Sequence, residues 1–229
     1  MGSTSEPEKG GYSRLHSPLY WLYEHLTRDD QPRPVELIFV LAGRMERKRY
    51  GMELYRAGLA PRLLLSVGRF EVSRMGIVDF EGADELIAQR NQTAPEDRHF
   101  FCEISAAGIR TERPMFSPWN TYGEIGALRK FVGHEMPRSM MIVSTDVHLR
   151  RIAIAVDEIF RDAPIEICYC PVPPGYSSLR KHEWWRRPQD RRYVLWETMK
   201  LASYRAILSL PEPLIQRIMR LKGDFHVGS

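Results

Sequence analysis

Four short, almost wholly apolar runs recur along the chain, and each ends near a small or polar residue. They cover residues 35–43, 62–68, 139–145 and 165–170. Runs of this kind are typical of strands that are buried on both faces of a parallel sheet. The pattern therefore predicts four buried strands.

Helical patterns lie between and around these runs. In the segment 148–160, Leu149, Ile152 and Val156 fall on one face of a helix, which gives a continuous apolar stripe. Similar spacing or flanking signals predict helices over 17–26, 79–90, 121–132 and 192–208. Strands that alternate with helices join through right-handed crossovers. We therefore expect an α/β fold with a doubly wound, mostly parallel, Rossmann-like sheet and helices on both faces.

The alternation of strands and helices sets the expected domain limits. Residues 1–16 are polar and form an expected flexible tail, residues 17–210 form one α/β domain, and residues 211–229 form a C-terminal extension. The stretch 69–117 is long for a single crossover and contains a further strand candidate at 99–104. We expect this stretch to depart from the simple alternation.

A second irregular stretch, residues 171–192, is rich in proline, arginine and tryptophan. Trp184 and Trp185 lie among basic residues, a pattern that single-stranded nucleic-acid binders use for base stacking. Surface loops more often use such tryptophans as anchors to the core. We favour the anchoring interpretation and do not expect nucleic acid as a partner.

Composition narrows the class of protein only modestly. The chain has 33 basic and 29 acidic residues and a net charge of +4, which is far from a concentrated basic face. It has neither a long apolar span nor an apolar signal core, so we expect no membrane span and a cytoplasmic location. Cys102, Cys168 and Cys170 are expected to be free thiols.

The candidate chemistry follows the strands. Ligands of open parallel sheets bind outside the carboxyl ends of the strands, so the residues that follow each strand are the candidates. They are Gly43 and Arg44 after the first strand, Ser66 and Gly68 at the end of the second, and Ser144 and Thr145 at the end of the third. Glycines at two of these loops allow a ligand to approach the backbone closely.

Cations stand where helices begin, although the positive end of a helix dipole disfavours them there. Arg44 and Arg47 follow the first strand, and His148 and Arg151 follow the third. Dipoles, N–H groups and cations directed at one crevice would bind an anion such as phosphate, with Arg47 and Arg151 as a clamp. Alternatively, these arginines extend into solvent or pair with nearby carboxylates. The clamp hypothesis predicts that replacing either arginine by alanine leaves stability unchanged or improves it.

His148 is the candidate for proton transfer, with Asp146 to orient or charge it. The alternative for His148 is a capping or phosphate contact without proton transfer. Thr121 and Glu124 have the spacing of a helix capping box, which leaves Asn120 free to face a ligand. No Gly-x-Ser-x-Gly elbow, P-loop or zinc-ligand spacing is present, so we assign no metal site.

Taken together, these segments resemble the YdcF/SanA/ElyC-like family, also called domain of unknown function 218. The resemblance spans about residues 35–160 and rests on segments in the family's order: LAG (41–43), Arg47, GMELYRAGLAP (51–61), SVG (66–68), NTYGE (120–124) and STDVHLRR (144–151). It implies a Rossmann-like fold and a loose link to bacterial envelope metabolism. The family pattern falls on Gly43, Arg47, Ser66, Gly68, Asn120, Thr121, His148 and Arg151.

Two functional hypotheses follow. The first is an anionic small-molecule ligand, phosphate-bearing or nucleotide-like, handled by a phosphoester hydrolase or transferase. The second is a non-catalytic sensor of a nucleotide or of S-adenosylmethionine. Both hypotheses require Arg47 and His148, about a hundred residues apart in sequence, to line one crevice with Asn120 on its third side.

Overall fold

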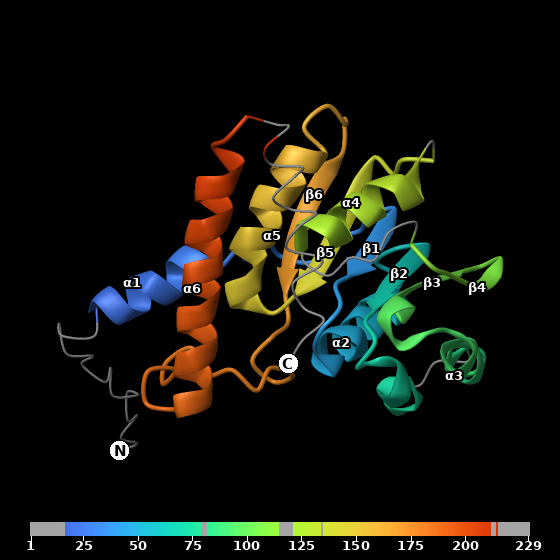
Figure 1. The fold of residues 1–229 in the computed structure, drawn as a ribbon, viewed down its shortest axis with the longest axis horizontal. Helices are drawn as coiled ribbons and strands as arrows, with labels where there is room; N and C mark the ends of the chain where they lie inside the picture. The colour runs from blue at the N-terminus through green and yellow to red at the C-terminus, as the bar shows by residue number, and fades with distance from the viewer. Residues whose placement is uncertain (1–16, 79–81, 115–120, 134, 212–213, 215–229) are drawn as a thin grey trace, which may run out of the picture.

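The computed structural model describes residues 17–78, 82–114, 121–133, 135–211 and 214 (Figure 1). Its centre is a six-stranded sheet in the order β4-β3-β2-β1-β5-β6. The strands are β1 (Leu37–Val40), β2 (Arg62–Val67), β3 (Phe100–Ser105), β4 (Gly108–Glu112), β5 (Ser139–Ser144) and β6 (Glu166–Pro171). The four strands expected from apolar runs are all present, together with the shorter strand expected at 99–104.

The helices are α1 (Ser17–Leu26), α2 (Met45–Arg56), α3 (Ala83–Gln92), α4 (Thr121–Val132), α5 (Asp146–Ile159) and α6 (Pro188–Leu208). Two 3-10 turns, η2 (Val72–Ile77) and η3 (Pro95–Asp97), flank α3. Helix α5 begins two residues before the predicted 148 because Thr145 has the extended backbone of an N-cap. Helix α6 begins at Pro188, earlier than the predicted 192, since proline is well suited to a first helical turn.

The sheet is doubly wound and mostly parallel, as the sequence predicts. Strands β2, β1, β5 and β6 are parallel to one another. The irregular stretch 69–117 adds a hairpin, in which β3 runs antiparallel to β2 and β4 antiparallel to β3. Strand β4 was not predicted, because its sequence GIRTE lacks an apolar run. As an edge strand with exposed and half-buried side chains, it needs none.

Alternate side chains of β1 supply the two cores on the faces of the sheet. Ile38 and Val40 pack with α2, η2 and α3, whereas Leu37 and Phe39 pack with α4, α5 and the end of α6 (Figure 1). Helix α2 therefore leaves β1 on one face, and α5 leaves β5 on the other. The boundary between β1 and β5 is the topological switch point, where the following loops diverge and leave a crevice.

Helix α1 and the stretch 171–187 form a third apolar cluster against α5 and α6. Tyr23 and Trp184 are almost fully buried there, alongside Val147 and Leu201. Trp184 therefore anchors the basic segment 180–192 to the core, which is the interpretation favoured from sequence. Within the described residues, no helix combines the length and apolar character needed to cross a bilayer.

Candidate functional site

Arg47 and His148 lie side by side at the switch point. Arg47 Nη2 is 3.1 Å from His148 Nδ1, although the residues come from α2 and α5 on opposite faces of the sheet. The predicted meeting of these two residues is confirmed. It follows from parallel strands whose carboxyl ends share one edge.

Arg47 is held by the loops that follow β1 and β5. Its Nη1 donates to the Ala42 carbonyl (2.5 Å) and its Nη2 donates to Thr145 Oγ1 (2.8 Å). Gly43 has a φ of +124°, and a Cβ there would lie 3.2 Å from Arg47 Nη1. Glycine at position 43 therefore provides both the backbone turn and the space that the guanidinium occupies.

Arg47 forms no ion pair within the described part of the chain, and its charge acts on the Glu124 carboxylate without a direct contact between the two side chains. The side chain is only 3% exposed, and its Nε has no hydrogen-bond partner. Burying an unpaired cation is costly, and donors left without acceptors add to that cost. An acceptor-rich anion would remove both costs.

The contacts of His148 assign its tautomer. Because arginine can only donate, His148 Nδ1 accepts from Arg47, and the ring proton is placed on Nε2, which donates to Thr121 Oγ1 (3.1 Å). Ser144 Oγ lies 3.3 Å from the same Nδ1. Burial, with Arg151 and Arg47 nearby, holds the pKa of His148 well below its ordinary value. The imidazole is therefore neutral, and both of its nitrogens are engaged.

Thr121 forms hydrogen bonds with both His148 and Arg151. Its Oγ1 accepts hydrogen bonds from His148 Nε2 and from Arg151 Nη1, so its own hydroxyl proton is left for a further acceptor. No acceptor for that proton occurs in the described ranges of the chain. Thr121 therefore supplies a second donor without an acceptor in the same buried cluster as Arg47.

The hypothesis that Asp146 orients His148 is wrong. Asp146 Oδ2 accepts from the Tyr23 hydroxyl at 2.5 Å, and Oδ1 accepts from the Val147 N–H at 2.8 Å. Asp146 is the first residue of α5, so its side chain binds the free N–H groups of its own helix and attaches α1 to it. Burial raises its pKa, although these hydrogen bonds act against the rise.

Arg151 faces a carboxylate that the sequence did not pair with it. Its guanidinium binds Glu197 of α6 through Nε (3.1 Å) and Nη2 (3.0 Å), and both side chains are buried. The anion-clamp hypothesis for Arg151 is therefore wrong in its simple form, since Glu197 already neutralises the charge. Sequence spacing did not reveal this pair because its members lie 46 residues apart.

The capping-box prediction for Thr121 and Glu124 is also wrong. Thr121 is the first residue of α4, and Glu124 Oε1 accepts from the Ala42 N–H (2.7 Å) in the loop after β1. Burial raises the pKa of Glu124, against the effect of the Ala42 N–H, the Ser66 hydroxyl and the nearby charges of Lys48 and Arg47. Asn120 lies outside the described residues.

A buried ion pair that sequence reasoning missed joins α2 to the loop after β2. Lys48 Nζ is 2.6 Å from Glu71 Oε1 and donates to the Leu41 carbonyl, while the Gly68 N–H donates to Glu71 Oε2 (2.9 Å). Burial alone would raise the pKa of Glu71, but Lys48 and the N–H groups of Gly43 and Gly68 lower it. The glycines at 43 and 68 thus hold a protein carboxylate.

Ser66 and Arg44 have partners of their own. Ser66 Oγ lies 2.8 Å from His99 Nε2, and burial lowers the pKa of His99 to about 4. His99 precedes β3, whose place beside β2 could not be read from the sequence. Arg44 pairs with Glu46, one of the carboxylates expected as an alternative partner, and its guanidinium lies 4.6 Å above the Tyr193 ring.

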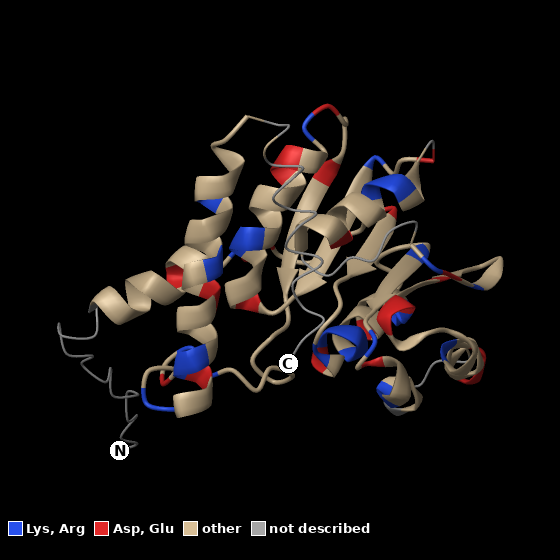
Figure 2. Cartoon of the chain, viewed as in Figure 1, with Lys and Arg blue, Asp and Glu red and all other residues tan. Residues whose placement is uncertain are grey.

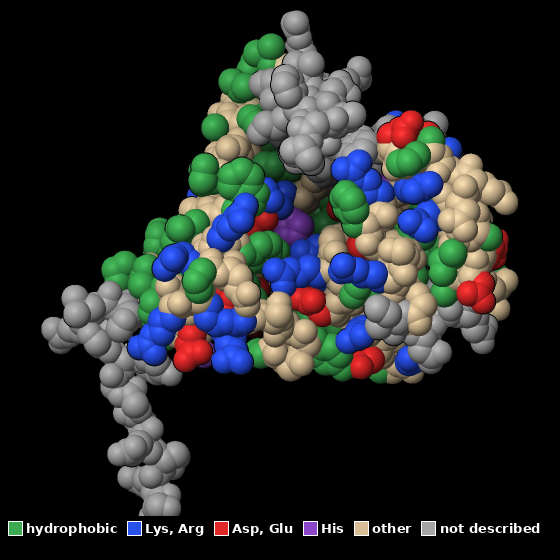
Figure 3. Space-filling model, turned by 60° about the horizontal axis from the view of Figure 1, so that its bottom comes forward, with side chains coloured by type: hydrophobic (Ala, Val, Ile, Leu, Met, Phe, Trp, Pro, Cys, Tyr) green, Lys and Arg blue, Asp and Glu red, His purple; other side chains and the backbone are tan. Residues whose placement is uncertain are grey.

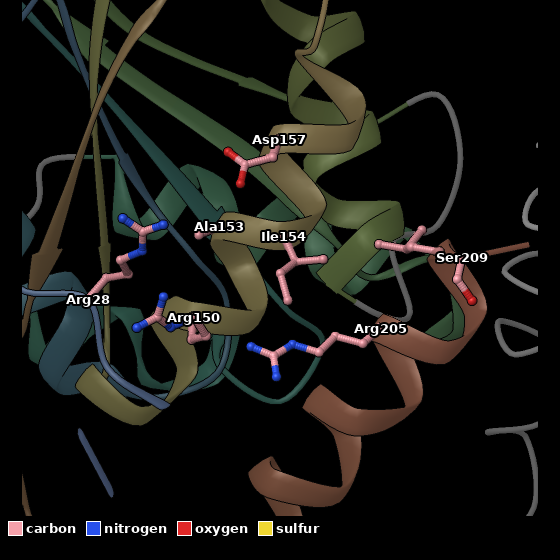
Figure 4. Close-up of a pocket in the computed structure, with 8 residues that line it drawn as sticks. Arg28, Arg150, Ala153, Ile154, Asp157, Arg205 and Ser209 are labelled. Carbon is pink, nitrogen blue, oxygen red and sulfur yellow. The ribbon is translucent and has the colours of Figure 1, made fainter. Parts of the chain in front are cut away.

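Charged residues gather at this edge of the sheet. Positions occupied by Lys or Arg and by Asp or Glu colour much of the α2 ribbon (Figure 2), and the space-filling view shows a hollow with histidine in it and Lys or Arg side chains around it (Figure 3). A separate cavity of about 390 Å³ lies between the end of α1, α5 and α6, where Arg28, Arg150 and Arg205 surround it (Figure 4). Its lining shares no residue with the Arg47 cluster.

The described residues contain no group of three or more histidine, cysteine and carboxylate side chains placed to bind a metal ion. Cys102, Cys168 and Cys170 are free and buried. Comparison of the chain with protein-family models, with curated proteins and with solved structures gives no match. The functional argument therefore rests on the geometry of the Arg47 cluster.

Proposed function

We propose that this protein binds a phosphate-bearing or nucleotide-like small molecule at the carboxyl ends of β1 and β5. The observation that carries the proposal is the buried Arg47, with no carboxylate partner among the described residues and with an Nε–H that has no acceptor. The unused hydroxyl proton of Thr121 lies in the same cluster. Phosphate oxygens would accept from both groups, and hydrogen bonds to charged groups are among the stronger ones.

The first turns of α2, α4 and α5 support the same proposal. Each begins at this edge of the sheet, and neither Arg44 nor Thr145, the N-caps of α2 and α5, makes a side-chain capping bond. The positive ends of these helix dipoles favour an anion there, although Asp146 already accepts from the Val147 N–H at the start of α5. The sequence resemblance to the YdcF-like family points to the same residues, namely Gly43, Arg47, Thr121 and His148.

A hydrolase or transferase of phosphoesters and a non-catalytic sensor of a nucleotide or S-adenosylmethionine remain the two forms of this proposal. The state of His148 favours the sensor. A neutral imidazole with both nitrogens hydrogen-bonded must first lose Arg47 or Thr121 before it can exchange a proton with a ligand. Turnover therefore requires a rearrangement of this cluster when a substrate binds.

A thermal-shift titration with inorganic phosphate, nucleoside monophosphates, p-nitrophenyl phosphate and S-adenosylmethionine tests the binding. A ligand present at ten times its Kd should raise the melting temperature by about 3–5 °C. Arg47→Met should weaken binding by about 10-fold to 150-fold, the value of a charged hydrogen bond. Arg205→Met, in the separate cavity of Figure 4, is the matched control and should bind as the wild type does.

If binding survives in Arg47→Met but is lost in Arg205→Met, the anion occupies the cavity between α1, α5 and α6, and the proposal is refuted. Phosphate release from a stabilising phosphoester, abolished in His148→Gln, identifies the enzyme. Stabilisation by the same compound with no release identifies the sensor.

A further inference from the structure

An open groove of about 800 Å³ lies between the first half of α6 and the loop after β1. Arg44 lines it on the loop side. Leu195, Trp196 and Met199 line it on the α6 side, with 46%, 54% and 61% of their surfaces exposed. Three large apolar side chains exposed within two turns of one helix are unusual for a water-facing helix surface.

Tyr193 joins this groove to the Arg47 cluster. Its hydroxyl is 3.0 Å from Thr145 Oγ1, which in turn accepts from Arg47 Nη2. Its ring lines the groove and lies under the Arg44 guanidinium. One side chain therefore has its polar end against the Arg47 cluster and also lines the groove, so the groove and the proposed anion site adjoin at Tyr193.

We propose that the groove binds the alkyl chain of an amphiphilic phosphate monoester whose head group occupies the Arg47 site. This inference rests on the proposed function. Charge complementarity supports it, since Arg44, Arg191 and Arg192 border the groove and favour an anionic head. The distance from Tyr193 to Met199 is roughly 9 Å along the helix axis, which suits a chain of medium length.

The side chains favour an alkyl chain over a nucleobase. A stacked base needs free aromatic faces, but one face of Tyr193 is covered by Arg44, and Lys200 Nζ lies 5.6 Å over the Trp196 ring. Leu195 and Met199 are aliphatic, and a flexible methionine adapts to an irregular apolar ligand. Base recognition also needs polar groups that match the edge of the base, and Gln189 is the one side-chain amide that lines the groove.

The test measures Kd by calorimetry for inorganic phosphate and for butyl, hexyl and octyl phosphate below their micellar concentrations. A fully buried methylene raises affinity about fourfold, and in this open groove we expect about twofold for each. Octyl phosphate should therefore bind on the order of tenfold more tightly than butyl phosphate. In Trp196→Ser/Met199→Ser this gain should vanish while inorganic phosphate binds unchanged.

Trp21→Ser is the matched control, since Trp21 is a tryptophan of α1 with 64% exposure that does not line the groove. It should keep the full dependence on chain length. An affinity that does not change with chain length, or that rises equally in the double variant, overturns the proposal. The groove would be a base site instead if adenosine monophosphate bound more tightly than octyl phosphate and if this difference in affinity disappeared in Trp196→Ser.

The two proposals fail in different ways. If inorganic phosphate binds and depends on Arg47 but the alkyl chain adds nothing, the groove assignment is wrong and the anion site stands. If no phosphate compound binds, the proposed function fails and the groove proposal fails with it. Light scattering provides a further check, because a stable dimer that buries Trp196 would mean that a second copy occupies the groove.

Discussion

Arg47 and Arg151 are both buried arginines in one cluster, yet their surroundings give them different roles. Arg151 binds Glu197 through two nitrogens, whereas Arg47 binds uncharged acceptors. Removing one member of a buried ion pair leaves the other charge buried without a partner, which destabilises the protein. Removing a buried charge that had no partner instead relieves a desolvation cost. The same substitution should therefore have different effects at the two positions.

Arg151→Met should destabilise the protein by up to about 3–5 kcal/mol, the cost of leaving a buried carboxylate unpaired, reduced by the ion pair that Glu197 keeps with Lys200. The earlier expectation of unchanged stability for this position is thereby reversed. Arg47→Met should change the free energy of unfolding by less than about 1 kcal/mol, since relief of the unpaired charge offsets its lost hydrogen bonds. Urea denaturation measures both. Equal losses in the two variants would contradict the distinction, and Arg151→Met/Glu197→Leu should recover much of the lost stability.

His148 and His99 make stability depend on pH. Burial lowers the pKa of His99 to about 4, and burial with Arg151 and Arg47 holds that of His148 well below its ordinary value. Because both pKa values are lowered in the folded state, the unfolded chain binds more protons than the folded one as the pH falls below about 6.5. The stabilisation is thus complete above pH 6.5 and falls as the pH drops, by up to about 1.4 kcal/mol per pH unit for each histidine. Denaturant melts from pH 7 to 5 should show this slope, reduced in His148→Gln and in His99→Gln; an unchanged slope in both would refute the assignment.

At the scale of elements, the approach of α2 to β1 depends on Gly51. A Cβ at Gly51 would lie 2.3 Å from Val40 Cγ2, a distance that packed atoms do not tolerate. Gly51→Ala should therefore push α2 outward and cost about 1–3 kcal/mol. Because Arg47 is carried by the first turns of the same helix, phosphate binding should weaken as well.

Gly76→Ala is the control for that change, since nothing lies within 4 Å of its Cβ position. It should be neutral or should stabilise the protein slightly by restricting the unfolded chain. Adding Val40→Ala to Gly51→Ala should cost less than the sum of the two single changes, because the new methyl group would fill the space that valine leaves. Fully additive costs would show that Gly51 does not set the distance between α2 and β1.

The elements that sequence could predict are those whose signal is local. Buried strands such as β1 and β5 are continuous apolar runs, and the α5 stripe repeats every three or four residues. Strand β4 has no such signal, because its place is set by pairing with β3 rather than by burial.

The candidate site divides in the same way. That Arg47 and His148 meet follows from parallel strands alone. The partners Glu197, His99 and Glu71 come from α6, the residue before β3 and the loop after β2, and no spacing in the sequence links them to the site. Asp146 lies two residues before His148 in sequence, which suggested a contact between them, but its carboxylate accepts from the Val147 N–H at the start of its own helix. Side chains whose partners are distant in sequence can be assigned only once the fold is known.

At the scale of the whole molecule, stability should decrease from the centre of the sheet to its edge. Strand β1 has neighbours on both sides and four fully buried residues, whereas β4 is an exposed edge. Backbone amides with few buried contacts open with low free energy, and those of central strands approach the global value. Hydrogen exchange should therefore be slowest in β1 and β5 and fastest in β4.

The same measurement with added phosphate locates the ligand on the molecule. If the anion neutralises Arg47, exchange should slow in the loop after β1 and in the first turns of α2 and α5, where N–H groups and Arg47 face the ligand. Any ligand that stabilises the folded state also slows amides that exchange by global unfolding, such as those of β1, so the informative amides are those that open locally. Protection should be absent in β4 and around Arg205, and Arg47→Met should abolish it at the sheet edge. Protection around Arg28, Arg150 and Arg205 that persists in Arg47→Met would instead show that the anion prefers the cavity between α1, α5 and α6, and that the carboxyl ends of the strands bind something else.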